Sequence, residues 1–126
     1  MYTVRRVFKP STKTTAFLFS ALLLFKIDGK PVEFADLHST NALLSRACAQ
    51  TAKCQAALAL PRASLKNIDL RSSANPGALI CEKLQGRTVI GTNRAGNQNA
   101  FCRFPDGSLV SCGSLHANAL TNDRKR

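Results

Sequence analysis

Five cysteines are the residues in this 126-residue chain whose type and spacing could do chemistry, either as disulfides or as metal ligands. Cys48 and Cys54 are six residues apart. On a continuous helix this spacing would separate them by roughly 9 Å along the axis, whereas a disulfide needs its α-carbons within about 7 Å. Either the helix breaks between them or each cysteine pairs elsewhere, and the sequence leaves both alternatives open.

Metal binding and catalysis are not favoured by the residues that could support them. No two cysteines have the close C-x2-C spacing of zinc sites, and neither His38 nor His116 has a ligand-spaced neighbour. The chain has no Ser-His-Asp order in a nucleophile-elbow setting, no glycine-rich phosphate loop and no cluster of carboxylates. We therefore expect a non-enzymatic protein without a metal site, a cofactor or a small-molecule substrate.

The formal net charge of +11 favours an anionic partner. The first 34 residues carry six basic and two acidic side chains, which leaves twelve basic and five acidic ones, a net charge of +7, in the rest of the chain. These later cations are scattered, except in the basic tail at 121–126, and scattered cations are more typical of a solvated surface than of a binding groove. The charge thus favours an anionic partner such as nucleic acid, lipid head groups or an acidic polymer, without locating a site. For an exported protein, we expect an envelope protein or an anionic surface polymer as partner.

The N-terminal segment, residues 1–30, has the pattern of a secretory signal peptide. Four basic and no acidic residues occupy positions 1–13, and the apolar run Ala16–Phe25 follows. Such a run suits a signal peptide, whereas a membrane-spanning helix needs about 20 apolar residues. No small-x-small cleavage triplet follows in the usual window. We expect an exported protein of the periplasm, the outer membrane surface or the medium; the alternative is that Ala16–Phe25 is a buried helix or strand of an intracellular protein.

The middle segment, residues 34–73, is predicted to be helical as far as Pro61. It is rich in alanine and leucine, contains no glycine or proline before Pro61, and spaces its apolar residues at near-helical intervals. Asp36 or Ser39 is a candidate N-cap. Pro61 ends the run because proline cannot continue the hydrogen-bond ladder, and a polar connector completes the segment.

The next segment, residues 74–120, begins with a short helix whose two ends are marked. Asn75 can cap the free amide groups, and Pro76 suits the first helical position because its missing N–H costs nothing there. Gly86 can take the left-handed conformation that ends a helix. The sequence therefore predicts a helix between Asn75 and Gly86.

Three stretches of strand composition follow this helix, at 87–92, 99–104 and 108–112. The turn signal Pro105-Asp106-Gly107 separates the last two. The whole chain is thus predicted to be an α+β protein: helical segments in its first part, then a short helix packed on a small antiparallel three-stranded meander.

Residues Asn75 to Cys112 resemble a small exported bacterial domain of unknown function whose members are often labelled hemolysins. The residues that carry the likeness are Asn75, Pro76, Cys81, Gly86, Gly96, Cys102, Pro105, Asp106 and Gly107. The resemblance implies an envelope or secreted protein in which Cys81 and Cys102 form a bonded pair. It therefore predicts a disulfide-stapled domain.

The chain departs from this family after Cys112. Members usually continue with acidic residues and an aromatic stretch centred on tryptophan, whereas this chain has Leu115 and contains no Trp. The further cysteine that many members carry is also missing, so Cys112 lacks its expected partner, for which Cys48 or Cys54 could substitute. With five cysteines, at least one stays free or pairs between chains.

Two hypotheses about function follow. The leading one is a non-enzymatic, exported binding or structural module of the cell envelope or medium. Lysis of membranes is not expected, because the chain beyond the N-terminal segment offers neither a run of about 20 apolar residues nor a long amphipathic hairpin. The alternative is an intracellular basic module for nucleic acid or another polyanion, in which Phe101, Arg103 and Phe104 form a stacking surface. A competing interpretation places both rings in a small core.

Overall fold

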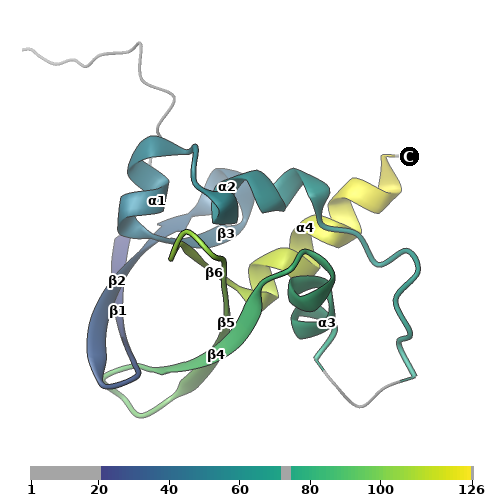
Figure 1. Ribbon diagram of the computed structural model, residues 1–126. Helices are drawn as coiled ribbons and strands as arrows, with labels where there is room; N and C mark the ends of the chain where they lie inside the picture. Colours follow the sequence, from purple (N-terminus) through teal and green to yellow (C-terminus); the bar gives the residue numbers. More distant parts are fainter. Residues whose placement is uncertain (1–20, 72–74, 126) are drawn as a thin grey trace, which may run out of the picture.

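The computed structural model describes residues 21–71 and 75–125, which contain six β-strands closed into an antiparallel barrel (Figure 1). The order around the barrel is β1-β2-β3-β6-β5-β4, so two three-stranded meanders, β1–β3 and β4–β6, meet at two seams. The strands are β1 (Ala21–Ile27), β2 (Lys30–Leu37), β3 (Ala42–Ser45), β4 (Arg87–Thr92), β5 (Gln98–Arg103) and β6 (Leu109–Ser111).

The two seams that close the barrel are short. β3 pairs with β6 at Leu44 and Val110, and β1 pairs with β4 only at Lys26 and Ile27. Pairing within each meander is longer, because all seven residues of β1 pair with β2 and all six of β4 pair with β5. Closure of the barrel therefore depends on few backbone contacts and on the side chains that fill the interior.

Aromatic rings fill much of the interior. Phe34 of β2 stacks on Phe101 of β5 with 4.4 Å between ring centroids, and Phe25 of β1 lies edge-on to both rings, at 5.7 and 5.0 Å. Gly91 makes room for them, because a Cβ at this position would lie 2.7 Å from the Phe101 ring. Such pairs stabilise a fold beyond the area that they bury, so one aromatic cluster joins strands of both meanders.

A second core lies between the outside of the barrel and the helices. Successive residues of β2 point to opposite sides, as a strand requires: Phe34 packs in the interior cluster, while Ala35 and Leu37 pack in the outer one. The outer core is covered by α1 (Arg46–Thr51), α2 (Gln55–Ala59), α3 (Pro76–Lys83) and α4 (Cys112–Arg124), with 3-10 turns η1 (His38–Thr40) and η2 (Leu60–Arg62). α3 and α4 pack against each other beside the barrel (Figure 1). Among the described residues, no helix has the length and apolar content needed to cross a membrane.

The predicted fold class is wrong in its first part. Residues 34–45, which are predicted to be helical, form the end of β2, the 3-10 turn η1 and β3, because strand pairing in the barrel buries their apolar residues and overrides local preference. Asp36 lies within β2 and Ser39 within η1, so neither caps a helix. The predicted helix and three strands of the second part are present, but these strands do not form a separate sheet, because they close into one barrel with β1–β3.

The segment grouped with a signal peptide also contributes to the barrel. Residues 21–30 form β1 and the turn into β2. Phe25 and Ile27 are buried, at 6% and 1% exposure. Residues 1–20 lie outside the described part of the chain, so the structure bears on the end of this segment and not on its beginning.

Helix occurs between residues 46 and 59 only as two short pieces. α1 ends at Thr51, and Ala52 then takes the left-handed conformation with φ +58°, which turns the chain before α2. Pro61 sits at the start of the 3-10 turn η2, where its missing N–H costs nothing. The turn at Ala52 is what determines how the neighbouring cysteines pair.

α3 begins as the sequence predicts. The Asn75 side chain accepts a hydrogen bond from the Gly77 amide at 2.7 Å, and Pro76 is the first helical residue. The residue that takes the left-handed conformation after the helix is Gln85, with φ +72°, and not Gly86. The predicted role of Gly86 as the left-handed helix end is therefore wrong.

Candidate functional site

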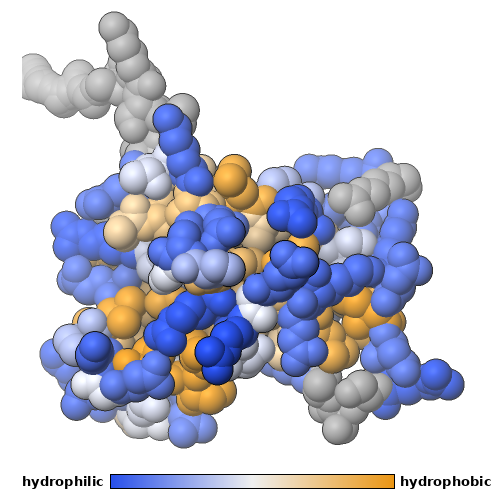
Figure 2. Space-filling model, in the orientation of Figure 1, coloured by the Kyte–Doolittle hydropathy of each residue, from blue (hydrophilic) through white to orange (hydrophobic). Residues whose placement is uncertain are grey.

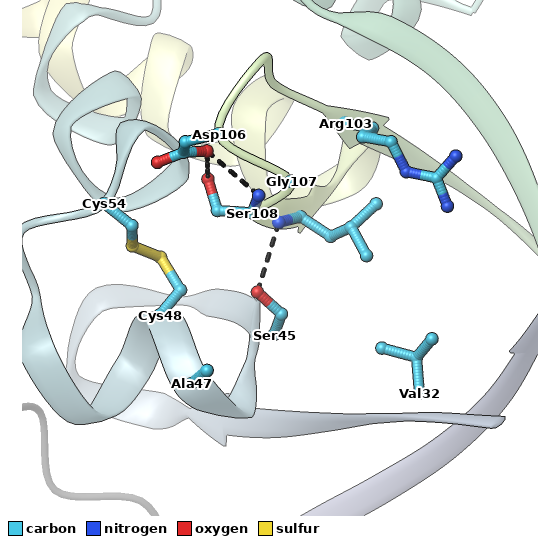
Figure 3. Close-up of a pocket in the computed structure, with 10 residues that line it drawn as sticks. Val32, Ser45, Ala47, Cys48, Cys54, Arg103, Asp106, Gly107 and Ser108 are labelled. Carbon is cyan, nitrogen blue, oxygen red and sulfur yellow. Dashed lines mark hydrogen bonds between the residues drawn. A yellow bond between two sulfur atoms is a disulfide. The ribbon is translucent and has the colours of Figure 1, made fainter.

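One end of the barrel opens into a cleft of about 430 Å³, which we call the mouth cleft (Figure 3). Val32 and Leu109 pack with the interior cluster and form its apolar inner part. The cleft is assembled from separate parts of the chain, and its lining residues are Val32, Ser45, Ala47, Cys48, Cys54, Arg103, Asp106, Gly107, Ser108 and Leu109. A site built from distant segments leaves no local pattern, which is why sequence analysis does not locate it.

One wall of the mouth cleft is the turn between β5 and β6, which is fastened to α2. Asp106 Oδ2 accepts from the Gln55 amide at 2.8 Å, and Gln55 Oε1 accepts from the Asp106 amide at 2.8 Å. Asp106 Oδ1 also accepts from the amide and hydroxyl of Ser108, at 2.9 and 2.5 Å. Burial opposes ionisation of Asp106, but these donated hydrogen bonds together hold its pKa below the ordinary value. The hydrogen bonds that its carboxylate accepts therefore fix this turn against α2.

The serine hydroxyl groups of the mouth cleft likewise accept hydrogen bonds from backbone amides. Ser45 Oγ accepts from the Leu109 amide at 3.1 Å, and Ser108 Oγ accepts from the Ala56 amide at 2.9 Å. None of the lining residues is a histidine that could act as their base. Within residues 21–71 and 75–125, no group of three or more His, Cys, Asp or Glu side chains could hold a metal ion. The serine hydroxyl groups therefore fix the backbone that forms the walls of the mouth cleft.

Arg103 supplies the positive charge of the mouth cleft. Its Nη1 donates to Asp28 Oδ2 in the β1–β2 turn at 3.2 Å. Both side chains of this pair are exposed to solvent, at 36% and 71%, and such a surface ion pair is weak. The guanidinium keeps further N–H donors, so the cleft combines apolar walls with one group that can bind an anion.

Cys112 does not pair with Cys48 or Cys54, which corrects the pairing considered from the sequence. Cys48 and Cys54 are bonded to each other, with α-carbons 5.4 Å apart, because the chain turns at Ala52. Cys112 is a free, buried thiol at the start of α4. Burial raises the pKa of Cys112 to about 11, although a hydrogen bond with Thr88 opposes this. The thiol stays protonated at neutral pH and is therefore a poor nucleophile and metal ligand.

Cys81 and Cys102 form the disulfide that the family resemblance implies. Their α-carbons are 5.6 Å apart, and the bond ties α3 to β5 across 21 residues of sequence. Both cysteines are fully buried. Gly86 passes close to this bond, because a Cβ there would overlap Cys102 Sγ and lie 3.0 Å from Cys81 Sγ. Glycine at this position therefore provides space for the disulfide.

The family-motif residues are not gathered into one site. Asn75 and Pro76 start α3, and Gly96 lies in the β4–β5 turn with φ +89°; none of the three lines the mouth cleft. Of the motif, only Asp106 and Gly107 line this cleft. Most of the motif thus defines turns, a helix start and a disulfide.

The stacking surface considered for a nucleic-acid module is not formed. Phe101 and Phe104 are 0% and 5% exposed. Phe101 belongs to the interior cluster and Phe104 to the outer core. Neither ring is available to a base, so the alternative that these rings fill a core is the correct one.

Residues 72–115 match the family model described as a domain of unknown function, DUF333. The match runs from just before α3 to the first turn of α4 and includes both cysteines of the Cys81–Cys102 disulfide. It supports a small domain of unknown function in this part of the chain. No curated protein and no solved structure matches the sequence.

Proposed function

We propose that this protein is a non-enzymatic module exported to the cell envelope or the medium, where it binds an envelope protein or an anionic polymer. The observation that carries the proposal is the presence of two disulfides, Cys48–Cys54 and Cys81–Cys102, in a small barrel. Disulfides form and persist in oxidising compartments and are rare in the cytosol. They also supply stability that a small core does not.

As part of this proposal, we place the matching region in the exported bacterial family whose members are often labelled hemolysins. The residues that support this are the helix start at Asn75 and Pro76, the bonded pair Cys81 and Cys102, and the Asp106 turn. We attach no lytic activity to the label.

Export has to leave β1 in the mature protein. β1 pairs with β2 along its whole length, and its Phe25 ring packs against the rings of both β2 and β5. A cut after residue 30 would remove this strand and open the barrel. We therefore propose that any processing cut falls before Ala21.

The mouth cleft gives the module one place for a partner. Its apolar part, formed by Val32, Leu109 and the Cys48–Cys54 bond, lies beside the Arg103 guanidinium. Concave sites with mostly apolar walls and a few polar groups are the usual form of a binding site. The combination suits an apolar group that carries a negative charge.

The proposal is tested by the intact mass of the protein purified from its native host, with thiols alkylated before and after reduction. We expect one alkylated cysteine in the unfolded but unreduced protein and five after reduction, in a chain that still contains Ala21. Extracytoplasmic fractions should contain the protein. Five free thiols in a cytoplasmic fraction would contradict export, and a mature chain that starts beyond Ile27 would contradict the retained strand.

A further inference from the structure

We infer that a second cleft, between α3 and the connector that follows η2, binds a phosphate group. Its volume is about 340 Å³, and its lining residues are Arg62, Ser64, Lys66, Asn67, Ile80, Lys83 and Leu84. We call it the cationic cleft. The connector runs beside α3 on the side of the molecule away from β1 and β2 (Figure 1), and most of the surface seen on that side in Figure 2 is hydrophilic.

Three positive side chains and no acidic side chain line the cationic cleft. Arg62, Lys66 and Lys83 are exposed, and none of them takes part in the four ion pairs found between described side chains. Three like charges around one cleft repel one another, and an anion with more than one negative charge relieves this repulsion. A phosphate offers several oxygens to several donors, whereas a single carboxylate would balance only one of the three cations.

Contacts with α3 and α4 hold the connector in place. Lys83 Nζ donates to the backbone oxygen of Lys66 at 2.8 Å. Asp123 of α4 accepts from Ser64 Oγ at 2.8 Å and from the next backbone amide at 2.9 Å. Asn122 donates to two backbone oxygens of the preceding turn, both at 2.9 Å. A site that is already formed loses little entropy when a ligand binds.

The donors left in the cationic cleft suit a phosphate. The Ser64 hydroxyl proton is committed to Asp123, and the Lys83 ammonium uses one of its three N–H groups on the connector. The side chains of Arg62 and Lys66 make no hydrogen bond to another described residue, and the Arg62 guanidinium can bind two phosphate oxygens at once. The apolar residues that line the cleft are Ile80 and Leu84, and the partly exposed Leu84 can contact an organic group that carries the phosphate.

Binding is measured on the oxidised, full-length protein labelled with ¹⁵N. Inorganic phosphate is titrated in one series, and vesicles of phosphatidylglycerol or of phosphatidylcholine alone are added in another. We expect phosphate to shift the amide signals of residues 64–67 and Lys83, and added salt to weaken the binding.

A matched pair of variants tests the location. Arg62→Gln with Lys66→Gln removes two cations of the cleft and leaves the backbone hydrogen bonds of the connector intact. Lys30→Gln with Lys53→Gln removes the same charge from exposed side chains outside the cleft. The first variant should bind at least about tenfold more weakly, because charge-assisted hydrogen bonds are lost. The second should bind within about twofold of the unchanged protein, because screening leaves distant charges little effect.

Equal weakening in both variants would overturn the inference, since it would mean attraction to the overall positive charge. Binding of neither probe would also overturn it, as would amide shifts confined to another part of the barrel. Phosphatidylglycerol-dependent binding that the cleft variant loses assigns the site to a lipid headgroup, and phosphate binding without vesicle binding assigns it to a soluble phosphate. The inference rests on the proposed function only in taking the partner to be anionic. The mass experiment decides export separately, so the two can fail independently.

Discussion

The two meanders of the barrel have the same number of strands but are reinforced in different ways. β4–β6 is tied to α3 by the buried Cys81–Cys102 bond. β1–β3 has no such tie, because the Cys48–Cys54 bond joins α1 to the start of α2 and neither cysteine lies in a strand. β1 also exposes Leu22 and Leu24, at 41% and 45%. The first meander therefore depends on strand pairing and barrel closure, whereas the second has a covalent link to its covering helix.

Of the changes that test this comparison, removal of β1 is expected to lower the stability of the protein most. A chain that begins at Lys30 loses Phe25, Ile27 and all seven pairs between β1 and β2. The total stability of a domain is only about 5–15 kcal/mol, so the loss of a strand and two core residues should abolish cooperative unfolding. Thermal unfolding followed by circular dichroism tests this.

A chain that begins at Ala21 is the matched control, because it keeps all six strands. It should unfold cooperatively. If the chain that begins at Lys30 also unfolds cooperatively, with Cys81–Cys102 oxidised, the second meander would be an independent domain. Its stability would then not depend on the first meander.

The disulfides should differ in how much they stabilise the protein. In the loop-entropy view, the bond across 21 residues contributes about 3 kcal/mol and the bond across six about 2 kcal/mol. Cys81→Ala with Cys102→Ala should therefore lower the free energy of unfolding more than Cys48→Ala with Cys54→Ala. The burial of both Cys81 and Cys102 adds to this difference. Urea denaturation of the two double variants gives the ranking, and the reverse order would show that the helices over β1–β3 are the more critical part.

Two glycines of the family motif are required for different reasons: Gly86 has no space for a side chain, whereas Gly96 has a positive φ. Gly86→Ala should cost about 2–3 kcal/mol, because the new methyl group overlaps the Cys81–Cys102 bond. Gly96→Ala should cost about 1 kcal/mol, because its φ of +89° disfavours a side chain while no atom lies within 4 Å of the new Cβ. The cost of Gly86→Ala should fall when both cysteines are alanine, which a double-mutant cycle measures. An unchanged cost would mean that the backbone of Gly86, and not the disulfide, sets the requirement.

Features of the second meander could be predicted because their causes are local. The capped start of α3 at Asn75 and Pro76, and the turn before β6 at Asp106 and Gly107, depend on residues next to one another in sequence. The Cys81–Cys102 pair followed from a family resemblance and not from its spacing.

Features of the first meander and of the helices after it could not be predicted because their local signals are missing or favour another structure. β2 buries residues on both of its faces, which hides the period of two of a strand, and its Ala35 and Leu37 favour a helix. The left-handed turn at Ala52, which allows Cys48 to reach Cys54, has no glycine or asparagine to mark it. The mouth cleft forms only when both meanders and α1 come together.

The smallest expected effect concerns the β5–β6 turn, which is hydrogen-bonded to α2. Asp106→Asn should cost about 1 kcal/mol, because the amide nitrogen that replaces one carboxylate oxygen cannot accept the bonds from Gln55 or Ser108. The pKa of Asp106 is lower in the folded protein than its ordinary value, so its contribution is complete above the ordinary pKa of an aspartate, about 4. The contribution is lost as the pH falls through the folded pKa.

The cost of Asp106→Asn should therefore be full at pH 7 and shrink below about pH 4, when urea denaturation is repeated across this range. Asp69→Asn is the control. Its pKa is also lowered, chiefly by a side-chain hydrogen bond from Arg71, but that contact is local to the connector and fully exposed. A measurable effect for Asp106 alone would show that its hydrogen bonds to α2 fasten the β5–β6 turn of the second meander to the helical segment that follows the first. Equal effects would reduce the role of Asp106 to that of a surface charge, and the link between the two regions would then rest on the aromatic cluster and the two strand seams.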